Sequence, residues 1–421
     1  MLDKESESKE KKEKIDSKCI FSKENVNTGH QPELDFFKAY CIFLIVIVHM
    51  YVNFTFGILI APLLLTLNII SANTLMFLMG LGMKYSRHNE PKHCISRGIA
   101  LLTISQFFNL IRDTLPNLIA WWTTGHQKFI SRALLVLETD ILTFAGFAFL
   151  FLALLKKLKL SDKFILIIGI IMNFANVFIY KIMKTPDNFF LRQFLGYFIF
   201  IENAEAFFPL LAYFIFVSFG NWLGGILQKV SNKDKFYNLI LIFGLPISPI
   251  FIYFISNNNI PFFPQYNRIE IYCMMPGPFA IIYCINNLIV VAIFYKIQKL
   301  FKGRIPKLVS HASKNLNQYY IISYAITMQM NVFLKATKGE NYPSTLKYPT
   351  LYAIILFFLS GILIDINDKY IHFTITTLKN PMRNYVFTFI WILTAISVIY
   401  IYPKVEVYAN IWNNYLNEAE T

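Results

Sequence analysis

Charge is scarce over long stretches of this chain. Asp, Glu, Lys and Arg together make up 15% of the 421 residues, whereas hydrophobic residues make up 56% and include 42 Phe. A composition so poor in charge excludes a soluble globule. Several segments of about 20 apolar residues are long enough to span a bilayer. The sequence therefore predicts an all-α fold, a polytopic integral membrane bundle of about 10–11 transmembrane helices.

Several chemical signatures are also missing. The five cysteines show no C-x-x-C spacing, and the histidines show no paired ligand spacing outside one basic loop. We therefore expect no metal site, no disulfide and no permanently bound cofactor. The chain has no G-x-S-x-G, Walker A or H-E-x-x-H motif. Those absences remove the signatures of several hydrolases and nucleotide-using enzymes.

The domain organisation follows from where the apolar runs begin and end. Residues 1–32 alternate Lys and Glu with Ser and Asn and predict a disordered, charged cytoplasmic tail. The tail has no apolar core of the kind that a secretory signal needs, so we expect the first spanning helix to direct insertion. Residues 33–403 form the predicted transmembrane domain, and residues 404–421 form a short C-terminal tail. Spans are predicted at 36–56, 68–84, 97–115, 133–155, 163–181, 205–228, 236–256, 278–298, 316–334, 348–366 and 385–403. The short apolar piece at 57–67 contains Pro62 and suggests an interfacial or re-entrant segment.

Lysine and arginine indicate the orientation in the membrane. The net charge of +14 could indicate a nucleic-acid partner, but in a polytopic chain we interpret it as loop cations that set topology, with no nucleic acid bound. The cations are concentrated in alternate loops, including 84–97, 156–163 and 296–314. Because positive loops stay in the cytoplasm, we expect a multi-pass plasma-membrane protein with the N-terminus inside and the C-terminus outside.

The first predicted span carries the most informative pattern. Asp35 and Lys38 stand at its start, and no charged residue follows until His49, eleven residues after Lys38. On a helix these two residues are about 16 Å apart along the axis and about 20° apart around it. Asp35 lies one turn before Lys38 on the same face. Ionisable groups at membrane depth usually mark function. His49 is therefore a candidate general base, the alternative being a structural histidine.

These residues also carry a family resemblance. The pattern Leu34-Asp35-x-x-Lys38-Ala39-x(9)-His49 resembles the N-terminal motif of the acyltransferase-3 family of membrane proteins. That family usually shows Leu-Asp-x-x-Arg-Gly with a His eleven residues after the Arg. In this chain Lys38 replaces the Arg and Ala39 replaces the Gly. Lys offers a point charge where Arg offers a planar fork.

Two further segments resemble the second and third helices of the same family. Gly80 stands where the family has the Gly of Phe-Phe-x-x-Ser-Gly-Phe. We interpret Gly80 and the nearby Gly82 as sites of close helix packing. Arg97-Gly98 resembles the basic start of the family's third helix. Arg97 would contact donor phosphates, the alternative being a plain cytoplasmic anchor. Arg112 and Asp113, further along the same segment, either pair with each other's neighbours or face the acceptor, and the simpler interpretation is that they are interfacial anchors.

Two more segments resemble the wider superfamily. Glu138 and Asp140 lie in a segment similar to the entry of a spanning helix in bacterial relatives of the heparan-α-glucosaminide N-acetyltransferases. They either cap that helix or bind the acceptor. Asn315 and Tyr319 lie in a segment that resembles Asn-Ser-Leu-x-x-Tyr near the end of acyltransferase-3 proteins. Their spacing places them on one helix face, where helix capping or interhelical hydrogen bonding would also explain them.

The resemblance implies a transmembrane acyltransferase. It would move an acyl group, expected to be acetyl, from cytoplasmic acyl-CoA to a carbohydrate or glycan acceptor at the outer side, as in O-acetylation of a cell-envelope polysaccharide. Acyl-CoA is then a donor substrate, and the bilayer and the glycan are the other partners. The implied catalytic residues are His49 as base with Lys38 and Asp35, the donor-binding residues are Lys38 and Arg97, and the acceptor-binding residues are Glu138, Asp140, Asn315 and Tyr319. The alternative is a non-catalytic transporter or exporter of a glycan or lipid-linked substrate, which would also use buried ionisable residues.

Overall fold

The fold is a bundle of helices. The computed structural model describes residues 19–56, 72–202, 204, 206–257, 273–302, 304–339, 345–346, 348–371 and 383–406. In its first half the helices are α2 (Pro32–Asn53), α4 (Ala72–Tyr85), α5 (Pro91–Asn109), η1 (Leu110–Thr114), α6 (Leu115–Thr124), α7 (Gln127–Ala133), η2 (Leu134–Leu137), α8 (Ile141–Lys157), α9 (Asp162–Ile182) and α10 (Phe189–Gly196). In its second half they are α11 (Leu210–Leu227), α12 (Lys233–Ser256), α13 (Gly277–Leu300), α14 (Lys307–Lys314), α15 (Leu316–Lys338), α16 (Pro349–Ile366), η4 (Asn367–Ile371) and α17 (Arg383–Glu406). One parallel pair of two-residue strands joins β1 (Thr55–Phe56) to β2 (Thr345–Leu346).

The predicted membrane class is supported by the length and composition of these helices. Within the described residues, eight helices are long and apolar enough to cross a membrane. They are Pro32–Asn53, Pro91–Thr124, Asp162–Ile182, Leu210–Leu227, Lys233–Phe254, Gly277–Leu300, Pro349–Tyr370 and Asn384–Val405. Three other predicted spans coincide with α4, α8 and α15, of which α4 and α8 have only 14 and 17 residues. The chain is thus a multi-pass helical protein.

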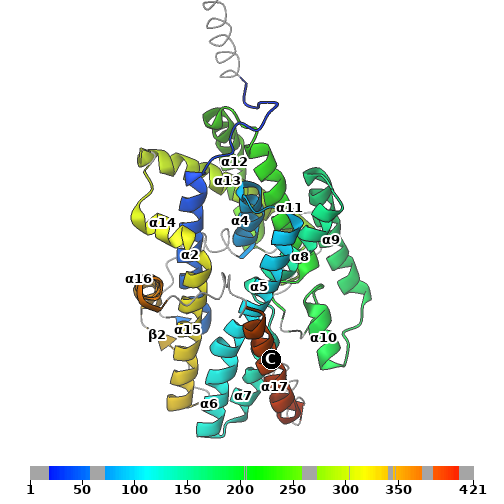
Figure 1. Cartoon of the computed structure of the whole chain (residues 1–421), viewed down its shortest axis with the longest axis vertical. Coiled ribbons are helices and arrows are strands. Elements are labelled where there is room, and N and C mark those ends of the chain that lie inside the picture. The colour runs from blue at the N-terminus through cyan, green and yellow to red at the C-terminus, as the bar shows by residue number, and fades with distance from the viewer. Residues whose placement is uncertain are drawn as a thin grey trace, which may run out of the picture.

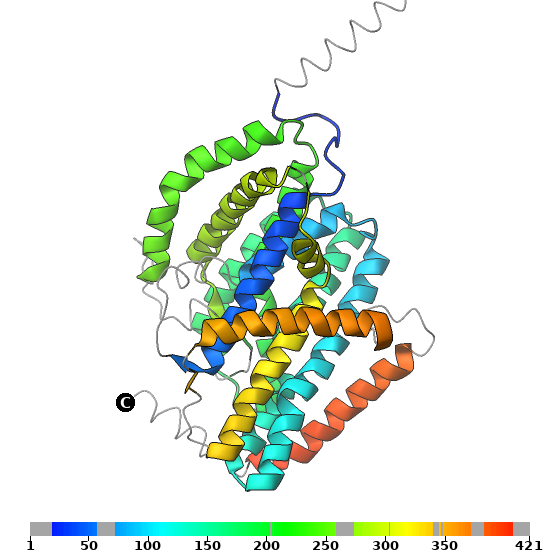
Figure 2. The same cartoon turned by 90° about the vertical axis from the view of Figure 1, so that its left-hand side faces the viewer.

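Helix α2 packs against five other helices. It contacts α4, α13, α14, α15 and α16, and most of its residues are buried. Figure 1 places α12 and α13 beside the beginning of α2, and α6, α7 and α17 at the opposite end of the molecule. Figure 2 shows α16 crossing α2 and α15 at a steep angle, and α12 curving around the outside of the bundle. Prolines at 246 and 249 inside α12 explain that curvature, because each removes a backbone hydrogen bond.

The third span is longer than predicted and contains a π-turn. The helix runs without a break over Pro91–Thr124, 34 residues, which is about 51 Å and exceeds a hydrocarbon core of about 30 Å. At η1 the amide of Leu115 donates to the carbonyl of Leu110, a five-residue spacing. Pro116 follows and has no N–H to give to residue 112, so the regular pattern cannot continue through this turn.

The predicted span at 133–155 begins too early. Residues before Glu138 belong to α7 and the 3₁₀ turn η2, and α8 starts only at Ile141. The helix is interrupted because two side chains at the break have other partners. Glu138 pairs with Arg112, and Asp140 accepts a hydrogen bond from the Thr143 amide as the N-cap of α8. An N-cap residue has an extended backbone and so marks a helix start.

Part of the predicted disordered tail is packed against the bundle. The Ser22 amide donates to the Lys229 carbonyl, and the Asn27 amide donates to the Gln228 carbonyl. The Asn27 side chain also donates to the Leu227 carbonyl. Residues 19–31 therefore follow the turn between α11 and α12, contrary to a tail disordered as far as residue 32. Residues 1–18, the predicted re-entrant piece at 57–67 and most of the predicted C-terminal tail lie outside the described residues.

Glycines bring α4 and α11 into close contact. A Cβ atom at Gly80 would lie 2.0 Å from the Val217 carbonyl oxygen, and one at Gly220 would lie 2.1 Å from the Phe77 carbonyl oxygen. Such distances require hydrogen in place of a side chain. The interpretation of Gly80 as a packing residue is confirmed. The same interpretation is wrong for Gly82, because no atom lies within 4 Å of a Cβ there.

Candidate active site

The eight predicted site residues fall into two groups. His49, Glu138 and Asp140 belong to one polar cluster in the middle of the bundle, which we call the central cluster. The other five, Asp35, Lys38, Arg97, Asn315 and Tyr319, belong to the helix ends beside the start of α2, which we call the entry group. The structure therefore separates Asn315 and Tyr319 from Glu138 and Asp140, with which they were expected to bind the acceptor.

His49 lies among the aromatic rings of α15. Its imidazole stacks on Tyr324, with ring centres 3.7 Å apart and planes at 21°. Tyr320 approaches it edge-on at 5.5 Å. The backbone carbonyl of His49 accepts a hydrogen bond from Asn53 one turn later. The Nδ1 atom is buried and has no hydrogen-bond partner among the described residues. An imidazole that is held in place by stacking and has a ring nitrogen without a hydrogen-bond partner can act as a general base.

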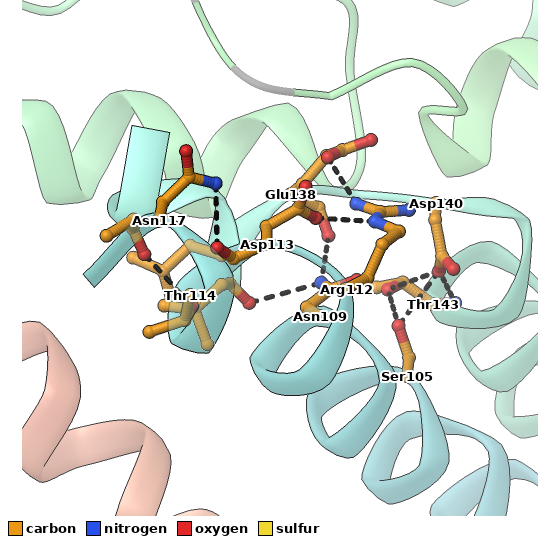
Figure 3. Close-up of polar contacts among 12 residues, drawn as sticks. Ser105, Asn109, Arg112, Asp113, Thr114, Asn117, Glu138, Asp140 and Thr143 are labelled. Carbon is orange, nitrogen blue, oxygen red and sulfur yellow. Dashed lines mark hydrogen bonds and ion pairs between the residues drawn. The ribbon is translucent and has the colours of Figure 1, made fainter. Parts of the chain in front are cut away.

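Arg112 is the charged centre of the central cluster. Its side chain is fully buried, and so is that of Asp113. The Arg112 Nε donates to Asp113 Oδ2 at 2.5 Å, and Nη2 donates to Glu138 Oε2 at 2.5 Å. Figure 3 shows the guanidinium reaching past Asp113 toward Glu138, with Asp140 beside it. The Arg112 guanidinium carbon also lies 4.7 Å from the centre of the Tyr324 ring. Tyr324 therefore contacts both Arg112 and His49.

Asp140 joins α8 to two other helices. Its Oδ1 accepts hydrogen bonds from the Thr143 amide at 2.9 Å and from the Ser105 hydroxyl of α5 at 2.8 Å. Its Oδ2 faces the Tyr320 hydroxyl of α15 at 3.4 Å. The capping role expected of this position is confirmed for Asp140. Glu138 acts differently, because its carboxylate is the partner of Arg112.

Arg112 and Asp113 are not the interfacial anchors that the sequence suggested. Both are buried inside the protein, since the π-turn at η1 directs them toward Glu138. One feature of the sequence indicated this site. They are the only Asp, Glu, Lys or Arg residues between Arg97 and Lys128, and isolated charges in an apolar run are usually functional. Sequence reasoning also missed Tyr320 and Tyr324. Their four-residue spacing on α15 places both on the face that meets His49.

The entry group combines ion pairs with unpaired cations. Asp35 accepts from the Ser313 hydroxyl of α14 at 2.6 Å and lies 2.6 Å from the His30 imidazole. Lys38 lies within electrostatic range of both Asp35 and Arg97. Neither Lys38 nor Arg97 forms an ion pair within the part of the chain that the structure describes. Arg97 instead lies over the Phe149 ring at 4.7 Å. Lys38 and Arg97 are thus cations without an ion-pair partner among the described residues, and such groups are suited to bind an anion.

Asn315 and Tyr319 contribute to the join between α14, α15 and α16. The Tyr319 hydroxyl lies 3.0 Å from Nδ1 of His311, whose Nε2 lies 3.2 Å from Asp365. The Tyr319 ring stacks on Phe357 with centres 4.8 Å apart. Asn315 is the residue between α14 and α15, and its carbonyl accepts from the Tyr319 amide. These contacts account for both residues as structural elements of the entry group.

No protein-family model, no curated protein and no solved structure matches this chain. Inferences about its activity therefore rest on the arrangement of its own residues.

Proposed function

We propose that this protein is a membrane-embedded acyltransferase that uses acyl-CoA, with acetyl-CoA as the expected donor, and a carbohydrate or glycan acceptor. The observation that carries the proposal is the spacing between the entry group and His49 along α2. Lys38 near the start of α2 and Arg97 of α5 are cations without an ion-pair partner in the described chain. A histidine with a free, buried ring nitrogen stands about 16 Å further along the same face. A donor with phosphates at one end and a thioester at the other matches that arrangement.

The entry group would bind the donor. Phosphates are bound by Lys as a point charge and by Arg as a planar fork, and both residue types are present. Asp35 is already engaged by Ser313 and His30, so its role would be to fix the start of α2 beside α14. This leaves Lys38 and Arg97 to contact the donor phosphates.

His49 would be the general base. It has no carboxylate partner among the described residues, and the groups around it are the rings of Tyr320 and Tyr324. A neutral imidazole can accept the proton of an acceptor hydroxyl or amine near neutral pH. Glu138 and Asp140 would lie on the acceptor side, where they hold Arg112 and Tyr320 in place.

The proposal includes a membrane orientation. An inside N-terminus would place the entry group at the cytoplasmic surface of the plasma membrane, where acyl-CoA is available, and would place His49 in the outer half. The lysine and arginine bias of the loops supports this orientation. Reporter fusions within 229–235 and at Thr421 test it. We expect the first to report a cytoplasmic site and the second an external one. An active cytoplasmic reporter at Thr421 would contradict the orientation.

A transporter or exporter of a glycan or lipid-linked substrate is the second candidate. The buried Arg112–Asp113–Glu138 charges and the π-turn beside them favour it, because both features also occur where solutes cross membranes. Membranes from expressing cells, fed acetyl-CoA labelled in the acetyl group, separate the two functions. An acyltransferase places label in an envelope glycan, and His49→Ala abolishes that labelling. A transporter leaves the glycan unlabelled while moving a preformed substrate.

A further inference from the structure

Acyl transfer needs a second group besides a base. When a nucleophile adds to a thioester, negative charge develops on the former carbonyl oxygen. Donors already aimed at that position supply much of the catalysis. Neither Lys38 nor His49 provides such a donor. The residue for this role should carry an N–H group that is buried near His49, held rigidly and without a hydrogen-bond acceptor in the resting protein.

Most hydrogen-bond donors near His49 are already committed. The Asn53 amide group donates to the His49 carbonyl, and the Asn109 amide group donates to the carbonyls of Val136 and Glu138. The Tyr320 hydroxyl faces Asp140. Arg112 is different. Its Nε and Nη2 atoms are used, but its Nη1 atom is buried and has no partner among the described residues.

The partners of Arg112 hold that free group in a fixed direction. Asp113 and Glu138 engage two of the three guanidinium nitrogens. The planar fork then leaves the third in a set orientation. The Phe108 ring at 4.9 Å and the Tyr324 ring at 4.7 Å lie against the guanidinium carbon. Tyr324 also stacks on His49, so one ring fixes the positions of the base and of the cationic donor relative to each other.

We propose that Arg112 is a catalytic residue that stabilises the oxyanion of the acyl-transfer intermediate through Nη1, and this role rests on the proposed acyltransferase function. His49 removes the proton of the acceptor hydroxyl while the acceptor oxygen bonds to the thioester carbon. The Arg112 Nη1–H donates to the resulting oxyanion. The carbon–sulfur bond then breaks, and CoA leaves as the thiol with the proton that His49 held. Tyr324 is a positioning residue in this scheme.

The test uses purified full-length protein and measures both kcat and KM for acetyl-CoA. Arg112→Gln removes the cationic donor but leaves Asp113 and Glu138 without their partner. The triple variant Arg112→Gln, Asp113→Asn, Glu138→Gln is therefore prepared as a second route to a folded protein. For whichever variants remain monodisperse, we expect kcat to fall about 10²–10³-fold, the usual effect of losing one oxyanion donor. KM should stay within about twofold, the pattern of an interaction made only in the transition state. Arg192→Gln, the same substitution outside the central cluster, serves as the control and should leave both constants unchanged.

Chemical rescue separates catalysis from structure. Arg112→Ala opens space for a small cation, so added methylguanidinium should restore part of kcat, whereas methylammonium should not. Tyr324→Phe should keep the wild-type kcat because it keeps the ring, and Tyr324→Leu should lower it.

A folded Arg112 variant with wild-type kcat would overturn the assignment, and so would an effect confined to KM. If those variants stay active while His49→Gln is inactive, only the oxyanion role fails. If His49→Gln is as active as wild type, the acyltransferase function fails as well.

Discussion

Two regions of the bundle hold their helices together by different means. Between α4 and α11, Gly80 and Gly220 let the two backbones meet directly. Between α2, η1 and α15, the contact includes His49, Arg112 and two tyrosines, and several buried polar atoms there have no partner among the described residues. Burying charges costs free energy, which ion pairing offsets only in part. The first region is built for stability. The second region contains buried charged and unpaired polar groups whose presence is not explained by a gain in stability. Such groups are typical of a functional site.

The largest effect should come from breaking the charges of the central cluster. Arg112→Met leaves Asp113 and Glu138 as buried carboxylates without their cation. Removing one partner of a buried ion pair typically costs about 3–5 kcal/mol. We expect a large drop in melting temperature. Unfolding of the protein in detergent is measured by its intrinsic fluorescence. The triple variant Arg112→Met, Asp113→Asn, Glu138→Gln has no unpaired charge and should recover most of that loss without recovering transfer activity. A triple variant that regains activity would show that the charges serve stability only.

The glycine contact should be the next most sensitive. Gly80→Ala puts a methyl group 2.0 Å from a backbone oxygen, so α4 and α11 must move apart. Overpacking usually costs about 1–3 kcal/mol, and a backbone obstacle cannot rotate away as a side chain can. Gly82→Ala is the matched control, because nothing lies within 4 Å of the added atom. We expect a lower melting temperature for the first variant only. Equal melting temperatures would mean that the helices adapt freely.

A smaller and purely functional effect is expected at the entry group. Lys38→Gln removes a cation that has no ion-pair partner in the described chain, so folding should be unchanged. Donor binding should weaken, with a several-fold higher KM for acetyl-CoA and little change in kcat, the pattern of lost uniform binding. Lys38→Arg should keep wild-type constants because it retains the charge. A Lys38→Gln variant with an unchanged KM would remove Lys38 from the donor site.

The smallest effect is expected for the N-terminal segment. Deleting residues 1–18 removes none of the contacts described for residues 19–31 and should leave the melting temperature unchanged. Deleting residues 1–28 also removes the backbone hydrogen bonds of Ser22 and Asn27 to the α11–α12 turn. Each such bond contributes roughly 0.5–1.5 kcal/mol at most. The protein should still fold, with a slightly lower melting temperature. Identical behaviour of both truncations would show that the segment adds no stability.

The contrast between the two regions also explains what the sequence allowed us to predict. The helical membrane class and most helix positions followed from apolar runs, whose length is a local property. Gly80 was identified from its place in a family-like segment and from the packing role of small residues, although the same reasoning was wrong for Gly82. The pairing of Arg112 with Glu138 could not be predicted. Helices α6 and α7 and the turn η2 lie between the two residues in the chain, and only the folded chain shows which charges meet.

The same limit applies to the site residues. His49 was found from its own position in an apolar run. Its surroundings were not, because Tyr320 and Tyr324 come from a helix far along the chain, and aromatic residues are common throughout the sequence. Asn315 and Tyr319 were assigned to the acceptor from a family resemblance and their spacing on one helix face. The structure places them among the contacts of α14 and α16, where their spacing serves helix packing.

The most direct test of the central claim is turnover of acetyl-CoA by purified protein in detergent. Turnover is measured as the rate at which the free CoA thiol is released. Wild type is compared with His49→Gln, which keeps hydrogen-bonding ability but cannot act as the base. The account predicts that His49→Gln still binds acetyl-CoA and that its kcat falls by roughly 10²–10⁴, the contribution usual for a general base. Turnover by His49→Gln at the wild-type rate would contradict the account and make His49 a structural histidine.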